Sequence, residues 1–304
     1  MREELTATLL PLATDPAMVF MTGDLGYRLF DDLERELGDR FINAGVAEQN
    51  MVSVAAGLAR SGLRPWVYSI APFVFARPFE QIRNDVCVHN LPVRLLGNGA
   101  GLSYGVQGTT HHAVEDYGVL LTLPNLRVFA PAFDQDVAGV IAAANALPGP
   151  CYIRLGRGEL PAGETAPAYG PWRRLVAGDG AVVVTTSTIS GSVWDAVRDL
   201  PAGDRPDVWT VAELPLGSLP DAVRSRIAGG APLVVIEEHT RHAGLVSMLA
   251  TRLLVDGVPV SSLRSLGLDS VAVGVYGSHS YLRAHTGLDA RAIRAAVLTA
   301  GEPE

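Results

Sequence analysis

Residues 41–70 have the sequence FINAGVAEQNMVSVAAGLARSGLRPWVYSI. A short apolar run turns at Gly45 into the stretch Gly45–Ser61, where most apolar residues recur at three- and four-residue spacing, and this spacing predicts a helix. The apolar run Arg64–Ile70 follows and predicts a strand. Such an alternation of short apolar runs with amphipathic stretches is typical of β-α units around a mostly parallel sheet.

The same alternation continues along the chain. Before residue 165, further strands are predicted at Ala17–Met21, Val93–Gly97, Leu126–Ala130 and Cys151–Leu155, and further helices at Arg77–Asn90 and Phe133–Ala146. After it, strands are predicted at Ala181–Thr186, Asp207–Val211 and Leu233–Glu237, and helices at Ser190–Asp199, Gly244–Val255 and Asp289–Thr299. Between the two sets, Gly158–Trp172 contains several Gly and Pro residues and little periodicity, which indicates a linker. The sequence therefore predicts an α/β protein with two domains, 1–165 and 166–304, each built on a mostly parallel sheet.

The composition narrows the class of protein. Of the 304 residues, 48% are hydrophobic and 18% charged, so a sizeable core is expected and disorder is not. The apolar stretches are shorter than the roughly 20 residues of a membrane span, and the first residues lack a signal-peptide pattern. The net charge of −8 argues against nucleic acid or an anionic membrane as the partner. Cys87 and Cys151 lie far from any second metal-ligand cysteine, so a soluble protein in a reducing cytoplasm is expected.

Glu48 is the first residue with a chemical interpretation. A carboxylate at the start of a helix is often only a favourable partner for the helix dipole. However, the run GVAEQNMVSVAAGLARSGLRP closely resembles the thiamine-binding segment of transketolases, of deoxyxylulose-phosphate synthases and of the beta subunits of 2-oxo acid dehydrogenase decarboxylases. The resemblance implies that Glu48 hydrogen-bonds N1′ of the aminopyrimidine of thiamine diphosphate. That bond favours the tautomer whose 4′-nitrogen removes the proton from the thiazolium carbon.

Three phenylalanines follow within Tyr68–Gln81, and phenylalanines ordinarily fill core. In the resembling families, one aromatic residue of this loop stacks on the aminopyrimidine, which fixes the ring plane while the glutamate fixes its edge. Phe73 is the first candidate for this role and Phe75 the second, because the loop length differs here and leaves the register open by one or two residues. Phe79 is assigned to the core.

The glycine-rich segment Gly97–Asp116 contains the pair His111 and His112. A histidine pair is usually surface or core, and no third ligand at helical spacing supports a zinc site. The Gly-x-Thr-His-His ending resembles the loop of transketolases and deoxyxylulose-phosphate synthases whose histidine hydrogen-bonds sugar hydroxyls near the reacting carbon. By this resemblance His111 binds substrate and takes part in proton transfer, and His112 matches the synthase branch.

The sequence also departs from both families. They typically have Glu-Asp-Gly where this chain has Val-Gln107-Gly, so Gln107 is expected to contact a substrate hydroxyl as a neutral donor and acceptor, with altered preference. A histidine that helps to hold the phosphate in transketolases would fall near Gly99, so that contact is expected to be absent. Arg157 matches the phosphate-binding arginine of the family, although a surface charge beside the linker is an equal alternative. Whether the substrate is phosphorylated stays open.

The second domain contains the motifs Val-Val-Ile-Glu237-Glu238-His239, Tyr276-Gly277-Ser278 and Gly287-Leu288-Asp289-Ala290. By these motifs it resembles the third domain of the same families. A thiamine-diphosphate pyrimidine-binding fold followed by a transketolase C-terminal-like domain is therefore expected. Glu237, Glu238 and His239 are interpreted as structural or interfacial, since that domain seldom contributes to the cofactor site. The families hold the diphosphate through Mg²⁺ with a Gly-Asp-Gly motif and a later Asn, but here Gly178-Asp-Gly180 precedes a predicted strand and no Asn occurs after Asn145. The motif is interpreted as a tight turn, and no metal ligand is expected in this chain.

These resemblances predict the beta-type subunit of a split transketolase, which transfers a two-carbon ketol unit from a ketose or ketose phosphate to an aldehyde. A separate N-terminal-type subunit would supply the diphosphate and Mg²⁺ site, and self-association would give a heterotetramer of two plus two. Two alternatives stay open. One is a decarboxylating synthase that joins a 2-oxo acid to an aldehyde, favoured by His111 and His112. The other is a non-catalytic regulatory subunit, against which the retained Glu48 and His111 speak.

Overall fold

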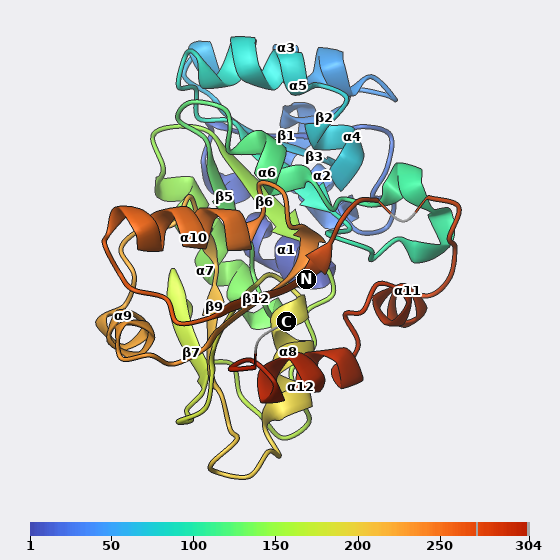
Figure 1. The fold of residues 1–304 in the computed structure, drawn as a ribbon. Coiled ribbons are helices and arrows are strands. Elements are labelled where there is room, and N and C mark those ends of the chain that lie inside the picture. Colours follow the sequence, from blue (N-terminus) through green and yellow to red (C-terminus); the bar gives the residue numbers. More distant parts are fainter. Residues whose placement is uncertain (272, 303–304) are drawn as a thin grey trace.

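The computed structural model of the chain describes residues 1–271 and 273–302, and in these residues the strands form two sheets (Figure 1). The first sheet has the order β10-β5-β6-β4-β3-β1-β2, with β1 (Met18–Thr22), β2 (Phe41–Asn43), β3 (Arg64–Ile70), β4 (Arg94–Asn98), β5 (Arg127–Phe129), β6 (Cys151–Leu155) and β10 (Glu213–Leu214). The second has the order β12-β11-β8-β9-β7, with β7 (Trp172–Val176), β8 (Val182–Thr186), β9 (Asp207–Val211), β11 (Leu233–Thr240) and β12 (Leu263–Leu268). In the described residues, neighbouring strands are parallel except in the pairs β5–β10 and β7–β9. The predicted α/β class with mostly parallel sheets is confirmed.

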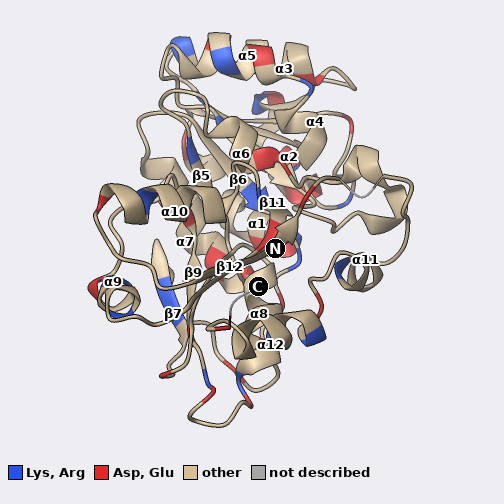
Figure 2. Cartoon of the chain, in the orientation of Figure 1, with Lys and Arg blue, Asp and Glu red and all other residues tan. Residues whose placement is uncertain are grey.

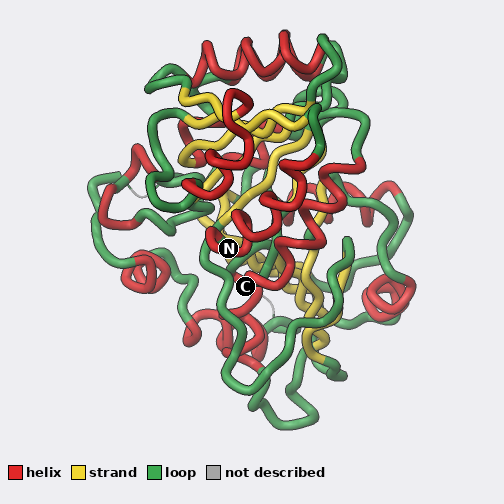
Figure 3. The backbone as a smooth tube through the Cα atoms, turned by 180° about the vertical axis from the view of Figure 1, so that it is seen from behind, coloured by secondary structure: helices red, strands yellow, loops and turns green. Residues whose placement is uncertain are grey.

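Helices surround both sheets. They are α1 (Arg2–Leu9), α2 (Asp31–Leu37), α3 (Glu48–Arg60), α4 (Ala71–Phe75), α5 (Phe79–Gln81), α6 (Asp116–Leu120), α7 (Val137–Ala146), α8 (Ile189–Val197), α9 (Asp221–Ala228), α10 (Leu245–Val255), α11 (His279–His285) and α12 (Ala290–Leu298). α3 lies at one end of the molecule, beyond the first sheet, and α12 lies at the other end, beside the second (Figures 1 and 3). Acidic and basic residues are interspersed over both halves (Figure 2). None of the helices in the described part of the chain is long and apolar enough to cross a bilayer.

β1 illustrates why the first sheet is covered on both faces. All five of its residues are buried, as expected for a parallel strand between two helical layers. Val19 and Met21 belong to the core cluster that includes the apolar side of α3. Met18 and Phe20 belong to the opposite cluster, which includes α1 and α7. The alternation of side chains along the strand therefore places α3 on one face and α1 with α7 on the other.

The predicted elements are observed, with some differences at the ends, but no element was predicted where α1, α2, α9, α11, β7 and β12 are observed. Each predicted strand lies within one residue of an observed strand at both ends, except that Leu233–Glu237 continues to Thr240 in β11. The predicted helix Arg77–Asn90 is observed as α5 followed by a π-helical segment, Ile82–Cys87. The division into domains near residue 165 stays a prediction, because β10, from the second part of the chain, pairs with β5 in the first sheet.

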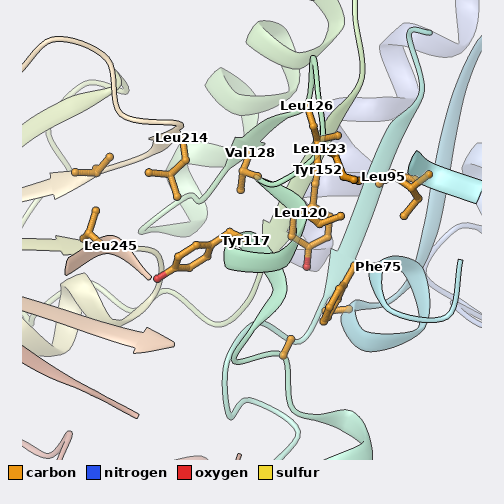
Figure 4. Packing of buried hydrophobic residues seen from close by; sticks show 14 of the residues in the cluster. Phe75, Leu95, Tyr117, Leu120, Leu123, Leu126, Val128, Tyr152, Leu214 and Leu245 are labelled. Carbon is orange, nitrogen blue, oxygen red and sulfur yellow. The ribbon is translucent and has the colours of Figure 1, made fainter. Parts of the chain in front are cut away.

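α6 connects the two halves of the chain at a buried polar network. Arg154 of β6 donates from Nε to the carboxylate of Asp116 at 2.8 Å, and both side chains are fully buried. Tyr117 projects from α6 toward the second half (Figure 4), where its hydroxyl donates to Glu237 of β11 and its ring stacks on His239 with 3.7 Å between centroids. Glu237 and His239 therefore lie at the contact between the halves, in agreement with their interpretation from the sequence.

Candidate active site

Glu48 lies at the start of a helix, beside an open pocket. Gly45, with a φ of 69°, turns the chain after β2, and α3 begins at Glu48. The Glu48 side chain is 4% exposed, and Nη1 of Arg77 donates to both of its carboxylate oxygens, at 3.0 and 3.1 Å. The pocket has a volume of about 550 Å³ and is lined by residues 46–50 and Arg77. The helix dipole and the guanidinium both stabilise a carboxylate in this place.

An aromatic ring and an imidazole lie next to the Glu48–Arg77 pair. The guanidinium carbon of Arg77 lies 3.8 Å from the ring centroid of Phe73, on α4. The rings of Phe73 and His111 meet edge to face, with 5.0 Å between their centroids. The structure thus joins Glu48, Phe73 and His111, three residues predicted from separate segments, in one continuous series of contacts through Arg77.

The other two phenylalanines of this segment pack against the core. Phe75 is 5% exposed and lies in the core cluster with Leu95 and Leu120 (Figure 4). Phe79 is half-buried against the same cluster. Phe73 and Phe75 are two residues apart on α4, and residues at this spacing point to nearly opposite sides of a helix. Phe75, the second candidate for stacking on a pyrimidine, is therefore directed into the core, whereas Phe73 contacts Arg77, which lines the pocket.

His111 is a half-buried imidazole at the end of a short 3₁₀ turn, Thr109–His111. Thr110 Oγ1 lies 2.9 Å from its Nδ1. Burial lowers the pKa of His111, and the positive charge of Arg77 lowers it further. The ring is therefore neutral at pH 7, so that one nitrogen donates a hydrogen bond and the other accepts one. These are the properties that a residue needs in order to exchange protons with a hydroxyl group.

His112 points into the protein instead of toward the pocket. It is 3% exposed, and it lies near Gly105, Glu238 and His279. The pKa of His112 is lowered, mainly by burial. The backbone at His112 is extended, and neighbouring side chains of an extended chain point to opposite sides. The structure therefore separates the two histidines, and His112 has almost no surface to offer a substrate.

Gln107 and Arg157 are both exposed. Gln107 ends a 3₁₀ turn in the loop that also contains His111. Arg157 follows β6 and lines a second pocket together with Gly99 and Tyr104. Gly99, with a φ of 91°, lies so close to the Tyr104 ring that a Cβ there would overlap it. A histidine at position 99 would therefore overlap the ring of Tyr104 in its present position.

Two residues of this region were not identifiable as site residues from the sequence. Arg77 follows Phe73 by four residues, a spacing at which side chains meet on a helical segment, and this is the signal that could have indicated it. Tyr104 belongs to no periodic pattern, although its ring lies 6.0 Å from that of His111 and its hydroxyl accepts from Asn98 at 2.7 Å. Tyr104 thus lines the pocket of Arg157 and lies near His111.

Gly178–Gly180 forms a turn between β7 and β8. The Asp179 side chain is 97% exposed, and a Cβ at Gly178 would overlap the backbone of Arg205. The turn leads into a strand and opens no helix. In the described ranges, 1–271 and 273–302, no three His, Cys, Asp or Glu side chains gather as a metal-binding group, and Cys87 and Cys151 are buried and unpaired.

Comparisons with known proteins show which family the chain resembles. The family model for the transketolase pyrimidine-binding domain matches residues 6–163. The B subunit of the apulose-4-phosphate transketolase of Actinobacillus succinogenes is 33% identical over 265 residues, which cover 85% of this chain and 84% of that protein. The 1-deoxy-D-xylulose-5-phosphate synthase of Myxococcus xanthus is 32% identical over 295 residues, 94% of this chain but 49% of that protein. A solved structure of a split-gene transketolase, an inactive beta4 tetramer, has a TM-score of 0.82 at 30% identity and covers 99% of this chain and 97% of its own.

Proposed function

The chain belongs to the transketolase family, and we propose that it is the pyrimidine-binding, beta-type subunit of a two-chain enzyme that transfers a two-carbon ketol unit from a ketose to an aldehyde. The observation that carries the proposal is the buried carboxylate of Glu48 at an open pocket, next to Phe73 and His111. Similarity to the B subunit of a transketolase over most of both chains supports the division between two chains.

The residues of the pocket fit the pyrimidine end of thiamine diphosphate, the cofactor of this family. When bound, the cofactor supplies the carbon nucleophile that attacks the substrate carbonyl. We assign Glu48 to N1′ at the ring edge, and its carboxylate, which is buried but lines the pocket, supports this role. We assign Phe73 to one face of the ring. His111, beside Phe73, would exchange hydrogen bonds and protons with substrate hydroxyls.

We assign the diphosphate and Mg²⁺ end of the site to a separate N-terminal-type subunit. The Gly178–Gly180 turn does not open a helix, whereas diphosphates are typically held at a helix N-terminus. Similarity to a split-gene transketolase, solved as a tetramer of beta chains, supports self-association of this subunit. The proposed assembly is therefore a heterotetramer of two beta-type and two N-terminal-type chains.

A decarboxylating synthase is the second candidate function. It is favoured by the similarity to a 1-deoxy-D-xylulose-5-phosphate synthase over nearly the whole of this chain. The roles of Glu48 and Phe73 would be the same in both enzymes, and the difference lies in the donor, a 2-oxo acid in place of a ketose. A comparison of donors therefore separates the two functions.

The isolated chain is expected to bind thiamine diphosphate weakly or not at all. It offers contacts to the pyrimidine but lacks those to the diphosphate and Mg²⁺, which supply much of the binding free energy. Calorimetry with Mg²⁺ present measures the affinity for thiamine diphosphate, and thiamine, which lacks the diphosphate, serves as the comparison ligand. The isolated chain should not distinguish thiamine from thiamine diphosphate, whereas the complex with its partner should strongly prefer the diphosphate. Submicromolar binding of thiamine diphosphate by this chain alone would contradict the two-chain site.

Arg77 contacts the Phe73 ring and the Glu48 carboxylate, the two groups that a bound pyrimidine would contact. Its guanidinium is planar, as an aminopyrimidine is; it stacks on Phe73 and donates to Glu48. A pyrimidine held between these residues therefore displaces Arg77, whose side chain is 45% exposed and has room to move into solvent. The ion pair between Glu48 and Arg77 thus competes with cofactor binding.

Arg77→Ala is accordingly expected to tighten cofactor binding by the reconstituted complex. The gain should be at most about fivefold, because an ion pair with one exposed partner contributes up to about 1 kcal/mol. Calorimetry at low and high salt measures it, and the advantage should shrink as salt screens the pair. Arg83→Ala is the matched control, since Arg83 pairs with the exposed Glu80 in the next segment. Weaker binding by Arg77→Ala would show that Arg77 holds the cofactor instead of competing with it.

A further inference from the structure

The loop from Gly101 to Ala113 carries both Gln107 and His111. Backbone hydrogen bonds between Gly101 and Ala113, at 2.9 and 3.0 Å, close the loop at its base. Between these ends the chain forms two short 3₁₀ turns and no longer helix or strand. A loop of this kind has few hydrogen bonds of its own to hold one conformation, so its order depends on what packs against it.

The second half of the chain covers one side of this loop, next to α11 (Figure 1). A Cβ at Gly105 would overlap the carbonyl oxygen of Gly277, and a Cβ at Gly108 would overlap the ring of Tyr276. Gly108 also has a φ of 74°, which most other residues avoid. The glycines let segment 276–278 lie directly against the loop, and this packing explains why the loop is rich in glycine.

Glu238 of β11 connects the base of the loop to α11. Its side chain is 1% exposed, and Oε1 accepts from the backbone N–H of Leu102 at 2.6 Å. The same carboxylate accepts from His279 Nε2 at 2.8 Å and from Arg283 Nε at 2.5 Å, both on α11. A Cβ at Gly101 would overlap Oε1, so the glycine makes room for this contact.

The charge of Glu238 is well compensated in this position. Burial alone would raise its pKa, but Arg283 and His279 hold the pKa of Glu238 well below its usual range. Arg283 is fixed in turn by a hydrogen bond from Nη1 to Ser192 Oγ of α8, at 2.8 Å. Glu238 is thus a permanent anion that binds three donors from two distant parts of the chain.

We propose that Glu238, with His279 and Arg283, forms a clasp through which the second half of the chain positions the substrate loop. Its function in setting Gln107 and His111 for a sugar rests on the proposed function of the enzyme. Hydrogen bonds to a reacting substrate tolerate little displacement, and a shift of about 1 Å can reduce the rate on the order of a hundredfold. Glu238 is therefore a positioning residue, which acts on the substrate through the loop.

Hydrogen exchange of the isolated chain tests the clasp without any partner or cofactor. Glu238→Gln keeps the size of the side chain but removes the charge that holds His279 and Arg283. Amide exchange in residues 102–112 should rise on the order of tenfold, because charge-assisted hydrogen bonds are lost. The matched control is Glu237→Gln, the neighbouring buried carboxylate, which accepts from the Tyr117 hydroxyl and from the N–H groups of Leu245 and Val246 and makes no bond to the loop. This control should change exchange at the start of α10 and leave residues 102–112 as in the wild type.

A second variant keeps the test decisive if Glu238→Gln does not fold. His279→Gln alters one arm of the clasp at a partly accessible side chain, 18% exposed, and should raise exchange in residues 102–112 to a smaller extent. Unchanged exchange of the loop in whichever of these variants folds would overturn the clasp.

The reconstituted complex then tests the consequence for the reaction. The clasp variants should lower kcat/KM for the sugar substrates on the order of tenfold or more, while the affinity for thiamine diphosphate stays within twofold of the wild type. A looser loop with unchanged kcat/KM would overturn the positioning role. If the wild-type complex transfers no ketol unit, the proposed function fails, but the exchange result for the clasp stands independently.

Discussion

Glu48→Gln is expected to lower kcat of the reconstituted enzyme on the order of 10²- to 10⁴-fold, the range for loss of a group that shares a proton in the reaction. Glutamine preserves the size of the side chain and one acceptor oxygen toward Arg77. It cannot share a proton with the pyrimidine nitrogen, so the cofactor can bind without being activated. Initial rates with saturating cofactor measure the loss in kcat.

The fold of Glu48→Gln should be preserved. Its partner Arg77 is 45% exposed, so weakening the ion pair should change the free energy of unfolding by about 1 kcal/mol or less. Thermal unfolding followed by circular dichroism checks this. Glu80→Gln is the matched control, because Glu80 is an exposed carboxylate paired with Arg83 and should retain full activity. Near-normal turnover of Glu48→Gln would remove this residue from the mechanism.

The meeting of Glu48, Phe73 and His111 could be predicted because each follows a strand of one parallel sheet. Glu48 comes after β2, Phe73 after β3 and His111 after β4. The carboxyl ends of parallel strands lie at the same edge of a sheet, where α/β proteins typically bind ligands. The resemblance of each segment to the family motifs was therefore sufficient to name these residues, and the sheet brings them together.

Contacts between distant segments could not be predicted in the same way. The pair Glu48–Arg77 joins residues 29 apart, and the bond from Leu102 to Glu238 joins residues 136 apart. Nothing in the periodicity of either segment indicates which other segment it meets. Phe75 illustrates the related problem of direction, since its position in the motif suits the site but the packing of α4 turns it into the core.

Short elements were missed for a different reason. α4 and α6 have five residues each and β10 has two, which is too few for a recurring pattern of apolar residues. These short elements are stabilised by contacts with neighbouring elements instead. β10 exists through its pairing with β5, and α6 is fixed by the buried contacts of Asp116 and Tyr117 with Arg154 and Glu237. Such elements follow from the assembled fold rather than from their own sequence.

His111→Ala is expected to slow donor cleavage by the reconstituted enzyme on the order of a hundredfold or more, because a residue that exchanges protons with a substrate hydroxyl is lost. Burial and Arg77 keep the imidazole neutral at pH 7, so the wild-type ring can both donate and accept. Alanine leaves the hydroxyl without a partner in a partly dry site. Single-turnover measurements of ketose cleavage separate this loss from an effect on cofactor binding, and His111→Gln tests whether hydrogen bonding alone restores part of the rate.

Gln107→Asp in the same loop is the informative comparison, because it restores the acid of the transketolase pattern without touching His111. Gln107 is exposed, so the change should cost little stability. Gln107→Asp should change which sugars the enzyme uses, because a site built to pair with a hydroxyl discriminates strongly against substrates that leave the site unpaired. Cleavage of the best donor should change less than in His111→Ala. A panel of ketose donors and aldehyde acceptors, with 2-oxo acids run alongside, measures both variants.

Unchanged selectivity in Gln107→Asp would show that the loop does not contact the substrate as proposed. Release of carbon dioxide from a 2-oxo acid by the wild type, with no cleavage of any ketose, would replace the transketolase with the decarboxylating synthase.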